Sequence, residues 1–561
     1  MIHGQNHSTP IDKYLDKLTG VFLLIWFIAF AVFLPGAKAG IVGDIPYLID
    51  AAEKQSFWDF INIEEGTALY HTAALNFYVL IKLFGTNYWL WHMLYVTIHA
   101  VNGLLLFVFM RNLLRHSAIK NALPLTLITA VLFVLCPHAS EVVIWEGSNH
   151  HAVATAIILS VLILVQKFHE VQKTGYAVLA LLLFLYSSFS HEFFYLTPWF
   201  TLLLIFYYRF ALGYNKVIFK KSFLYFFIPL VLLFIGHLVL LRIVKHTYIS
   251  HFGELAKMPV YFYLGKPLKY IFHVLFMGRF FSFETRHKIY TLCESKAVII
   301  SFYAVLIIYW GYVLLRIRQV NAKAKIIALV SVYVLGVYFL LSPLDFADSL
   351  LVAYDRYVYP STGFAFLIPV LLVSYIPVRA LQLSLISGYI VLNICLTTKV
   401  NIYWKQSAYV IRQLLEGFPD PADKKVLLLN LPDDLNGIPM ISAQDEGRFK
   451  IMKNTLTRQR VSNKIYDVVA YKMSEISDGA YVNVINDSTV RVTLNQWGTW
   501  WLYGLLGAAS YENADYKVNM TDPGHWYELT LKKPASEYLI LYQVGSQWKA
   551  VDWSKKNTDQ N

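Results

Sequence analysis

Asp44 is the first acidic residue after the first long apolar run, in the stretch Gly43-Asp44-Ile45-Pro46. Further acids follow at Asp50, Asp59, Glu64 and Glu65. A carboxylate at a helix exit beside a turn-forming proline would be held against the membrane surface, at the mouth of the cavity that the later helices enclose, and ionisable groups in such a place are candidate functional residues. The alternative is an ordinary polar loop, because any loop collects acids.

A second polar stretch runs from residue 137 to residue 151. It carries acids and imidazoles at His138, Glu141, Glu146, His150 and His151. Apolar runs border it on both sides, so it could line a site, or it could be a solvated hairpin with Trp145 at the interface. Metal binding by His138, His150 and His151 is conceivable, although their spacing matches no established ligand pattern.

Ser190-His191-Glu192 interrupts what would otherwise be a long apolar run. Ionisable groups in such a place are costly unless they face a cavity or a partner. His191 and Glu192 are therefore candidate binding residues. The alternative is a plain turn between two helices.

The stretch Asp355-Arg356-Tyr357 could bind phosphate, because a guanidinium donates two parallel hydrogen bonds to phosphate oxygens. Arg356 could equally pair with neighbouring Asp355. The segment from residue 242 to residue 296 adds cations interleaved with Tyr and Phe, which suits contact with anionic lipid head groups or simple snorkelling at the interface.

The composition shows what must position these residues. Hydrophobic residues make up 57% of the 561 residues, charged residues only 15%, and the mean hydropathy is +0.48. These values are typical of a polytopic membrane protein. The three cysteines offer neither a disulfide framework nor a zinc spacing.

About eleven apolar runs approach the length that spans a bilayer. They cover residues 18 to 39, 88 to 110, 122 to 139, 150 to 167, 174 to 190, 192 to 208, 222 to 243, 297 to 316, 325 to 342, 360 to 377 and 380 to 398. The first is long enough to be a spanning anchor rather than a cleaved signal. Residues 68 to 84 are predicted to lie at the interface.

The distribution of Lys and Arg predicts the orientation. With the N-terminus in the cytoplasm, the cytoplasmic loops contain 16 basic residues and three acids, and the other side of the membrane part contains 14 basic residues and 15 acids. The Asp44 loop is therefore expected outside the cytoplasm.

The chain changes character after residue 400. We predict a membrane domain over residues 1 to 400 and a mostly β extracytoplasmic domain over residues 401 to 561, with a short helix and strands in five β-rich stretches. These stretches are residues 426 to 429, 481 to 485, 489 to 494, 527 to 531 and 538 to 544. The tail has 18 basic and 18 acidic residues, so the net charge of +12 belongs to the membrane part and does not indicate nucleic acid.

The order of these motifs resembles a family. The series runs from Asp44 through Lys82-Leu83-Phe84-Gly85, Trp91-His92-Met93, Ile98-His99-Ala100-Val101-Asn102, Pro137-His138-Ala139-Ser140-Glu141, Trp145-Glu146-Gly147, Ser190-His191-Glu192 and Asp355-Arg356-Tyr357 to Ser361. Over residues 20 to 380 it is similar to polytopic glycosyltransferases of the GT-C fold, most of all to bacterial relatives of the transmembrane O-mannosyltransferases.

The resemblance implies that Asp44 is a general base or an acceptor-positioning carboxylate. It implies a polyprenyl-phosphate sugar donor, used at the outer leaflet of a bacterial inner membrane. This chain departs from the family pattern where it has Gly43-Asp44 instead of paired acids, Tyr70-His71 instead of Arg-Pro and His191-Glu192 instead of Lys-Glu.

The function expected from this resemblance is transfer of a sugar to a hydroxyl of a glycan, lipid or protein acceptor. Asp44 would be catalytic, and the substrate-binding residues would be Glu141, Glu146, His150, His191, Glu192, Asp355, Arg356 and Tyr357. No cofactor is certain, although a divalent metal would be compatible with the site. The alternatives are a lipid or sugar transporter or flippase, and a non-catalytic envelope assembly protein.

Overall fold

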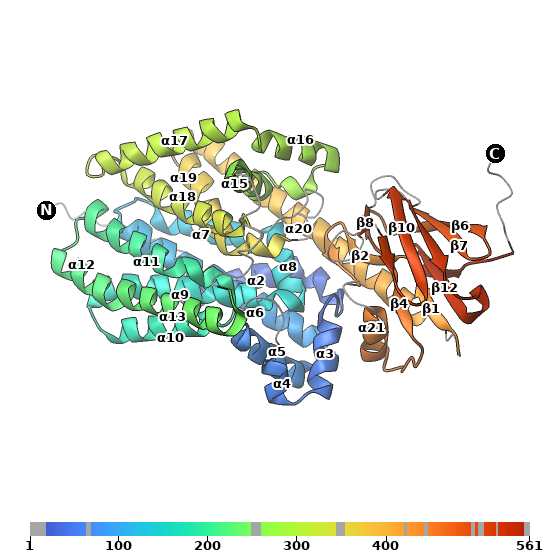
Figure 1. Cartoon of the computed structure of the whole chain (residues 1–561). Helices are drawn as coiled ribbons and strands as arrows, with labels where there is room; N and C mark the ends of the chain where they lie inside the picture. The colour runs from blue at the N-terminus through green and yellow to red at the C-terminus, as the bar shows by residue number, and fades with distance from the viewer. Residues whose placement is uncertain are drawn as a thin grey trace.

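A computed structural model shows a bundle of long helices joined to a β-rich C-terminal domain (Figure 1). It describes residues 18–62, 69–247, 260–343, 354–419, 423–441, 447–494, 500–502, 510–522 and 526–554. The acids Glu64 and Glu65 lie outside the described residues. The predicted architecture, a polytopic helical protein with a β-rich tail, is confirmed.

All eleven predicted apolar runs are helical. Among the described residues, seven helical stretches are long and apolar enough to cross a membrane. Their main helices are α2 (Leu18–Phe33), α6 (Tyr88–His116), α9 (Asn149–Val171), α13 (Ile228–Lys245), α17 (Lys296–Leu315), α18 (Ala322–Leu341) and α20 (Arg379–Glu416). The other four runs are short or broken helices.

The short and broken helices surround the polar stretches. Helix α7 (Ala122–Val134) is followed by a 3-10 turn (Pro137–Ala139) and α8 (Ser140–Ile144), with a bend of 53°. Pro137 accounts for this break, because proline cannot donate the hydrogen bond that would continue α7. The shorter helices are α10 (Gly175–Ser188), α11 (Thr197–Phe206) and α19 (Tyr359–Val373).

Three helices lie between the first two spans: α3 (Ile45–Lys54), α4 (Phe57–Ile61) and α5 (His71–Phe84). Helix α5 is the segment predicted to lie at the interface. It has 14 residues, fewer than the long spans, and it exposes Leu75, Val79 and Leu83. Of these helices, α3 packs beside the C-terminal domain (Figure 1).

Helix α20 continues through residue 400 to Glu416, so the predicted domain boundary falls inside a helix. The strands beyond it are β1 (Lys425–Leu428), β2 (Leu431–Leu435), β3 (Ile438–Pro439), β4 (Ile465–Asp467), β5 (Ala470–Met473), β6 (Ala480–Asn486), β7 (Thr489–Leu494), β8 (Trp500–Leu502), β9 (Ser510–Glu512), β10 (Tyr516–Asp522), β11 (Trp526–Leu531), β12 (Tyr538–Val544) and β13 (Gln547–Ala550). All five predicted β-rich stretches are strands.

The strands form three sheets, in the orders β13-β12-β1-β4, β3-β2-β5-β8 and β6-β7-β11-β10-β9. Strand β1 is parallel to both β12 and β4. Helix α21 (Arg448–Thr457) packs against α3 of the membrane domain. The Gly43 N–H donates to the Met440 carbonyl at 2.9 Å, so the loop before Asp44 is fixed to the tail.

Candidate functional site

Arg356 and Glu141 form the centre of the site. Glu141 lies on α8 and is buried, and Arg356 lies on a 3-10 turn (Asp355–Tyr357) before α19. The backbone N–H of Arg356 donates to Glu141 Oε2 at 2.8 Å, and its guanidinium pairs with Glu141 Oε1. The bend after α7 brings this carboxylate to the arginine. Arg356 therefore pairs with Glu141, while Asp355 pairs with Arg279.

Aromatic rings surround the Arg356 guanidinium. Its central carbon lies 5.0 Å from the Trp145 ring centroid, 4.9 Å from that of Tyr354 and 4.8 Å from that of Tyr357. Cations are attracted to aromatic faces at such distances, so the three rings help to orient the Arg356 guanidinium.

Trp145 also connects Arg356 to the Asp44 loop. Gly43 has a φ of +63°, and a Cβ added there would lie 3.1 Å from Trp145 Nε1. Both the left-handed backbone and the indole favour glycine, which explains why an acid does not precede Asp44. The indole nitrogen has no hydrogen-bond partner within the described residues.

Asp44 faces the C-terminal domain. Its carboxylate pairs with Arg448, the first residue of α21, and its side chain is 42% exposed. A second carboxylate, Asp433 on β2, comes from the same domain. Burial raises the pKa of Asp433 above its usual range; Lys472 opposes the rise, and the charges of Asp434 and Asp44 add to it.

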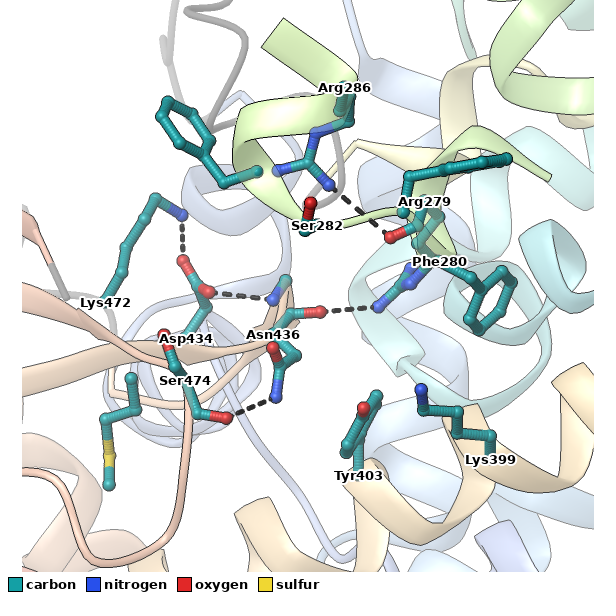
Figure 2. Close-up of a pocket in the computed structure, with 14 residues that line it drawn as sticks. Arg279, Phe280, Ser282, Arg286, Lys399, Tyr403, Asp434, Asn436, Lys472 and Ser474 are labelled. Atoms are coloured by element: carbon teal, nitrogen blue, oxygen red, sulfur yellow. Dashed lines mark hydrogen bonds and ion pairs between the residues drawn. The ribbon is translucent and has the colours of Figure 1, made fainter. Parts of the chain in front are cut away.

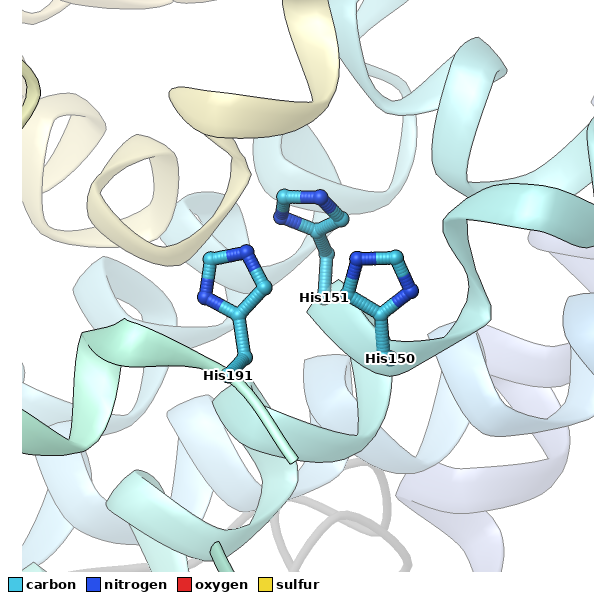
Figure 3. A group of neighbouring side chains, drawn as sticks. All are labelled: His150, His151 and His191. Carbon is cyan, nitrogen blue, oxygen red and sulfur yellow. The ribbon is translucent and has the colours of Figure 1, made fainter. Parts of the chain in front are cut away.

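The imidazoles of His150, His151 and His191 meet in one cluster (Figure 3). Arg356 is close enough for its charge to act on His191. Ring centroids are 4.4 Å apart for His150 and His151, 4.3 Å for His151 and His191 and 5.1 Å for His150 and His191. The Tyr357 ring packs on His151 at 5.2 Å, which joins the imidazoles to the arginine.

Glu192 lies beside these imidazoles. Its Oε2 is 3.8 Å from His191 Nδ1, and its Oε1 accepts a 2.6 Å hydrogen bond from the Tyr70 hydroxyl. His191 and Glu192 therefore lie among the imidazoles and Tyr70, in addition to forming the turn between two helices. Tyr70 stands where the family resemblance expected an arginine.

Asp355 faces away from this cluster and is completely buried. It accepts hydrogen bonds from His138 Nδ1 at 3.0 Å and His273 Nε2 at 2.6 Å, and it pairs with Arg279. Burial alone would raise the pKa of Asp355, but the Arg279 guanidinium and the imidazoles hold it well below its usual range. His138 therefore lies in this network, apart from His150 and His151.

Buried polar atoms without partners gather in the segment after α7. Within the described residues, both carboxylate oxygens of Glu146 lack a hydrogen-bond partner, as do Ser148 Oγ, Asn149 Oδ1 and His151 Nδ1. Burying a polar group without a partner costs about 1–3 kcal/mol. Buried polar atoms without partners are uncommon in protein interiors, so this segment is a candidate for binding a polar ligand.

A basic cleft of about 260 Å³ separates the membrane domain from the tail (Figure 2). Its cations are Arg279, Arg286, Lys399 and Lys472, accompanied by one acid, Asp434. Lys472 pairs with Asp434, and Arg279 donates to the Asn436 carbonyl at 2.8 Å. Arg279 thus contacts both the Asp355 network and the tail.

Several of these residues were not expected from the sequence. Arg279 and Arg286 were only two of the cations between residues 242 and 296. Arg448 and Asp433 lie about 400 positions beyond Asp44, in a tail without recognisable motifs, so no local signal could place them at the site.

Comparison with known proteins returns structural neighbours alone, because no family model and no curated protein matches the sequence. The apo oligosaccharyltransferase of Archaeoglobus fulgidus is 12% identical, with 89% of this chain and 76% of that chain covered and a TM-score of 0.43. The oligosaccharyltransferase AglB of the same organism, with an inhibitory peptide and a dolichol-phosphate, is 10% identical (81% and 65% covered, TM-score 0.37).

Apo ArnT from Cupriavidus metallidurans is also similar, at 12% identity, with 83% of this chain and 93% of that chain covered and a TM-score of 0.36. At these values the likeness assigns neither a donor nor an acceptor to this chain. The structure itself defines a polytopic helical membrane protein whose polar site adjoins a β-rich C-terminal domain.

Proposed function

We propose that this protein is a membrane glycosyltransferase that moves a sugar from a polyprenyl-phosphate donor to an acceptor hydroxyl. The observation that carries the proposal is the contact of Trp145 with both Gly43 and Arg356. Through Trp145, the loop that carries the half-exposed Asp44 carboxylate adjoins the Arg356 guanidinium. These are the two groups that such a transfer needs: a proton acceptor and a cation for the leaving phosphate.

In the proposed reaction, Asp44 accepts the proton of the acceptor hydroxyl. The acceptor oxygen forms a bond to the anomeric carbon as the bond from that carbon to the phosphate oxygen breaks, with inversion. The negative charge that develops on the polyprenyl phosphate is stabilised by the positive charge of the Arg356 guanidinium, which the ion pair with Glu141 holds in place.

The remaining predicted residues have subordinate roles in this proposal. Glu141 and Tyr357 orient Arg356. Glu146, His150, His191 and Glu192 supply polar contacts to the sugar or the acceptor. Asp355, being enclosed by Arg279 and two imidazoles, positions the turn that carries Arg356 and is not proposed to contact substrate.

We place the site on the extracytoplasmic face of a bacterial inner membrane, with a cytoplasmic N-terminus. The arrangement of the basic segments supports this orientation, because α12 (Lys216–Ser222) lies at the end of the bundle opposite to the C-terminal domain (Figure 1). The basic cleft, with Arg286 and Lys399, would then meet anionic lipid head groups of the outer leaflet.

The test is transfer by purified protein in liposomes supplied with a panel of polyprenyl-phosphate sugars and a hydroxyl acceptor mixture. We expect transfer from at least one donor, and Arg356→Ala should raise the donor concentration needed for half-maximal rate at least tenfold. Arg491→Ala is the control, because Arg491 pairs with Glu528 on the sheet of the tail.

Transfer by Arg356→Ala with unchanged donor dependence would contradict the role of Arg356. Movement of donor across the bilayer without transfer from any donor would instead indicate a flippase.

A further inference from the structure

The cluster of His150, His151 and His191 has the composition of a metal site. One ligand atom from each residue can be chosen so that all three lie within 4.8 Å of one another. His150 and His151 begin α9, and His191 precedes a 3-10 turn (Glu192–Leu196), so residues from two separate segments converge (Figure 3). Imidazole nitrogen suits zinc, copper, iron and nickel better than magnesium or calcium.

The surroundings of the three rings match those of metal-bound histidines. Such a histidine donates its other ring N–H to a carboxylate or a backbone carbonyl. His191 Nδ1 lies 3.8 Å from Glu192 Oε2, and Tyr70 holds the other oxygen of that carboxylate. A ring N–H of His150 donates to the Gly147 backbone. His150 therefore has an outer partner that leaves one nitrogen for an ion, and Glu192 is a carboxylate close to the His191 ring.

His151 provides a second, independent indication. Its side chain is buried, with 1% of the residue exposed, yet Nδ1 has no hydrogen-bond partner within the described residues. A buried nitrogen in that state costs free energy, whereas a metal ion would use its lone pair. In the structure, His191 Nδ1 accepts a 3.3 Å hydrogen bond from the Phe193 N–H. With a metal ion bound to Nε2, the ring proton would instead be on Nδ1, directed at Glu192.

The charge balance allows a cation. Arg356 lies close to the rings, but its positive charge is paired with Glu141, and Glu192 adds a negative charge on the side of His191. The other histidine group, His138 and His273 with Asp355, is different because Arg279 already pairs with its carboxylate.

We propose that His150, His151 and His191 bind one divalent transition-metal ion of the zinc class, with Glu192 as the positioning residue that orients His191. Three nitrogen ligands leave a fourth tetrahedral position open, as in zinc sites that accept water or substrate. The ion would join the start of α9 to the turn before α11 beside Tyr357. This inference does not depend on which sugar is transferred.

The experiment uses full-length protein in detergent, purified through a tag that contains no histidine. After equilibration with micromolar Zn²⁺ and removal of free ion, metal analysis should find about one equivalent in wild type. His150→Ala and His191→Ala should each lower the content at least tenfold. His116→Ala is the control, because His116 is the last residue of α6 and pairs with Glu170, which lies at the end of α9 opposite to His150 and His151.

A direct titration of wild type with Co²⁺ does not depend on whether the variants fold. The visible absorption of a tetrahedral cobalt site should appear and saturate at one equivalent. Absence of both zinc and the cobalt spectrum in wild type would overturn the proposal, and so would a full equivalent of zinc in His150→Ala. If wild type bound zinc but transferred no sugar, the result would count only against the proposed function.

Discussion

Two histidine clusters lie on either side of the Asp355–Tyr357 turn, and they differ in how their charges are balanced. In one, His138 and His273 donate to Asp355, which also pairs with Arg279, so the carboxylate is fully engaged. In the other, the imidazoles of His150, His151 and His191 face one another, and His151 Nδ1 lacks a partner within the described residues. The first cluster can brace the fold, and the second is suited to a ligand.

The largest expected effect is from Asp355→Asn. This change leaves the Arg279 guanidinium buried without its counter-ion, and breaking a buried ion pair costs about 3–5 kcal/mol. We expect a large fall in the thermal midpoint of the detergent-solubilised protein. Asp50→Asn, which removes an ion pair with the exposed Lys54, should change the midpoint little. Equal thermal midpoints for the two variants would contradict the claim that the buried pair of Asp355 and Arg279 stabilises the fold.

Low pH should weaken the interaction of Asp355 with Arg279 over a defined pH range. The folded pKa of Asp355 is held well below its usual range, so the stability that it supplies is complete above the unfolded pKa, about 3.9, and is lost as the pH falls through the folded pKa. We expect the difference in stability between wild type and Asp355→Asn to be constant from pH 7 to about pH 5 and to shrink below about pH 4. A difference that shrinks near pH 6 would identify another group.

Zinc should distinguish the two clusters. Ligand at 100 times its dissociation constant stabilises the folded state by about 2.7 kcal/mol. We expect Zn²⁺ to raise the thermal midpoints of wild type and of His138→Gln, and to leave that of His151→Gln unchanged. If His138→Gln lost the response and His151→Gln kept it, the assignment of the two clusters would be reversed.

The smallest effect is expected from Glu192→Gln. It keeps the three imidazoles and removes the charge that faces His191 Nδ1. Changes to such outer partners lower metal affinity about 10–100-fold. A competitive zinc titration should therefore show weaker binding with the stoichiometry unchanged, and equal affinity would exclude Glu192 as an orienting group.

The sequence predicted the helices and strands better than the tertiary contacts between them. Helices and the five β-rich stretches followed from hydropathy and alternation, which are local. The break at Pro137 turned one predicted span into a bent pair, and that bend decides where Glu141 points. Partnerships such as Asp44 with Arg448 and Asp355 with Arg279 join distant segments, and neither hydropathy nor spacing encodes them.

The residue before Asp44 is glycine for a physical reason. The positive φ of Gly43 and its contact with Trp145 both favour glycine over an acid at this position. The carboxylate near Asp44 comes instead from Asp433 in the tail, where burial raises its pKa. The C-terminal domain therefore contributes charged groups beside the proposed catalytic residue.

The central claim is that Asp44 removes the acceptor proton, and the rate of sugar transfer by Asp44→Asn in liposomes tests it most directly. A positioned base contributes about 10²–10⁴-fold, so we predict a fall of at least a hundredfold, with thermal stability and zinc content near those of wild type. Asp50→Asn, a neutralised acid on the same helix, should transfer at the wild-type rate. A wild-type rate for Asp44→Asn would contradict the account.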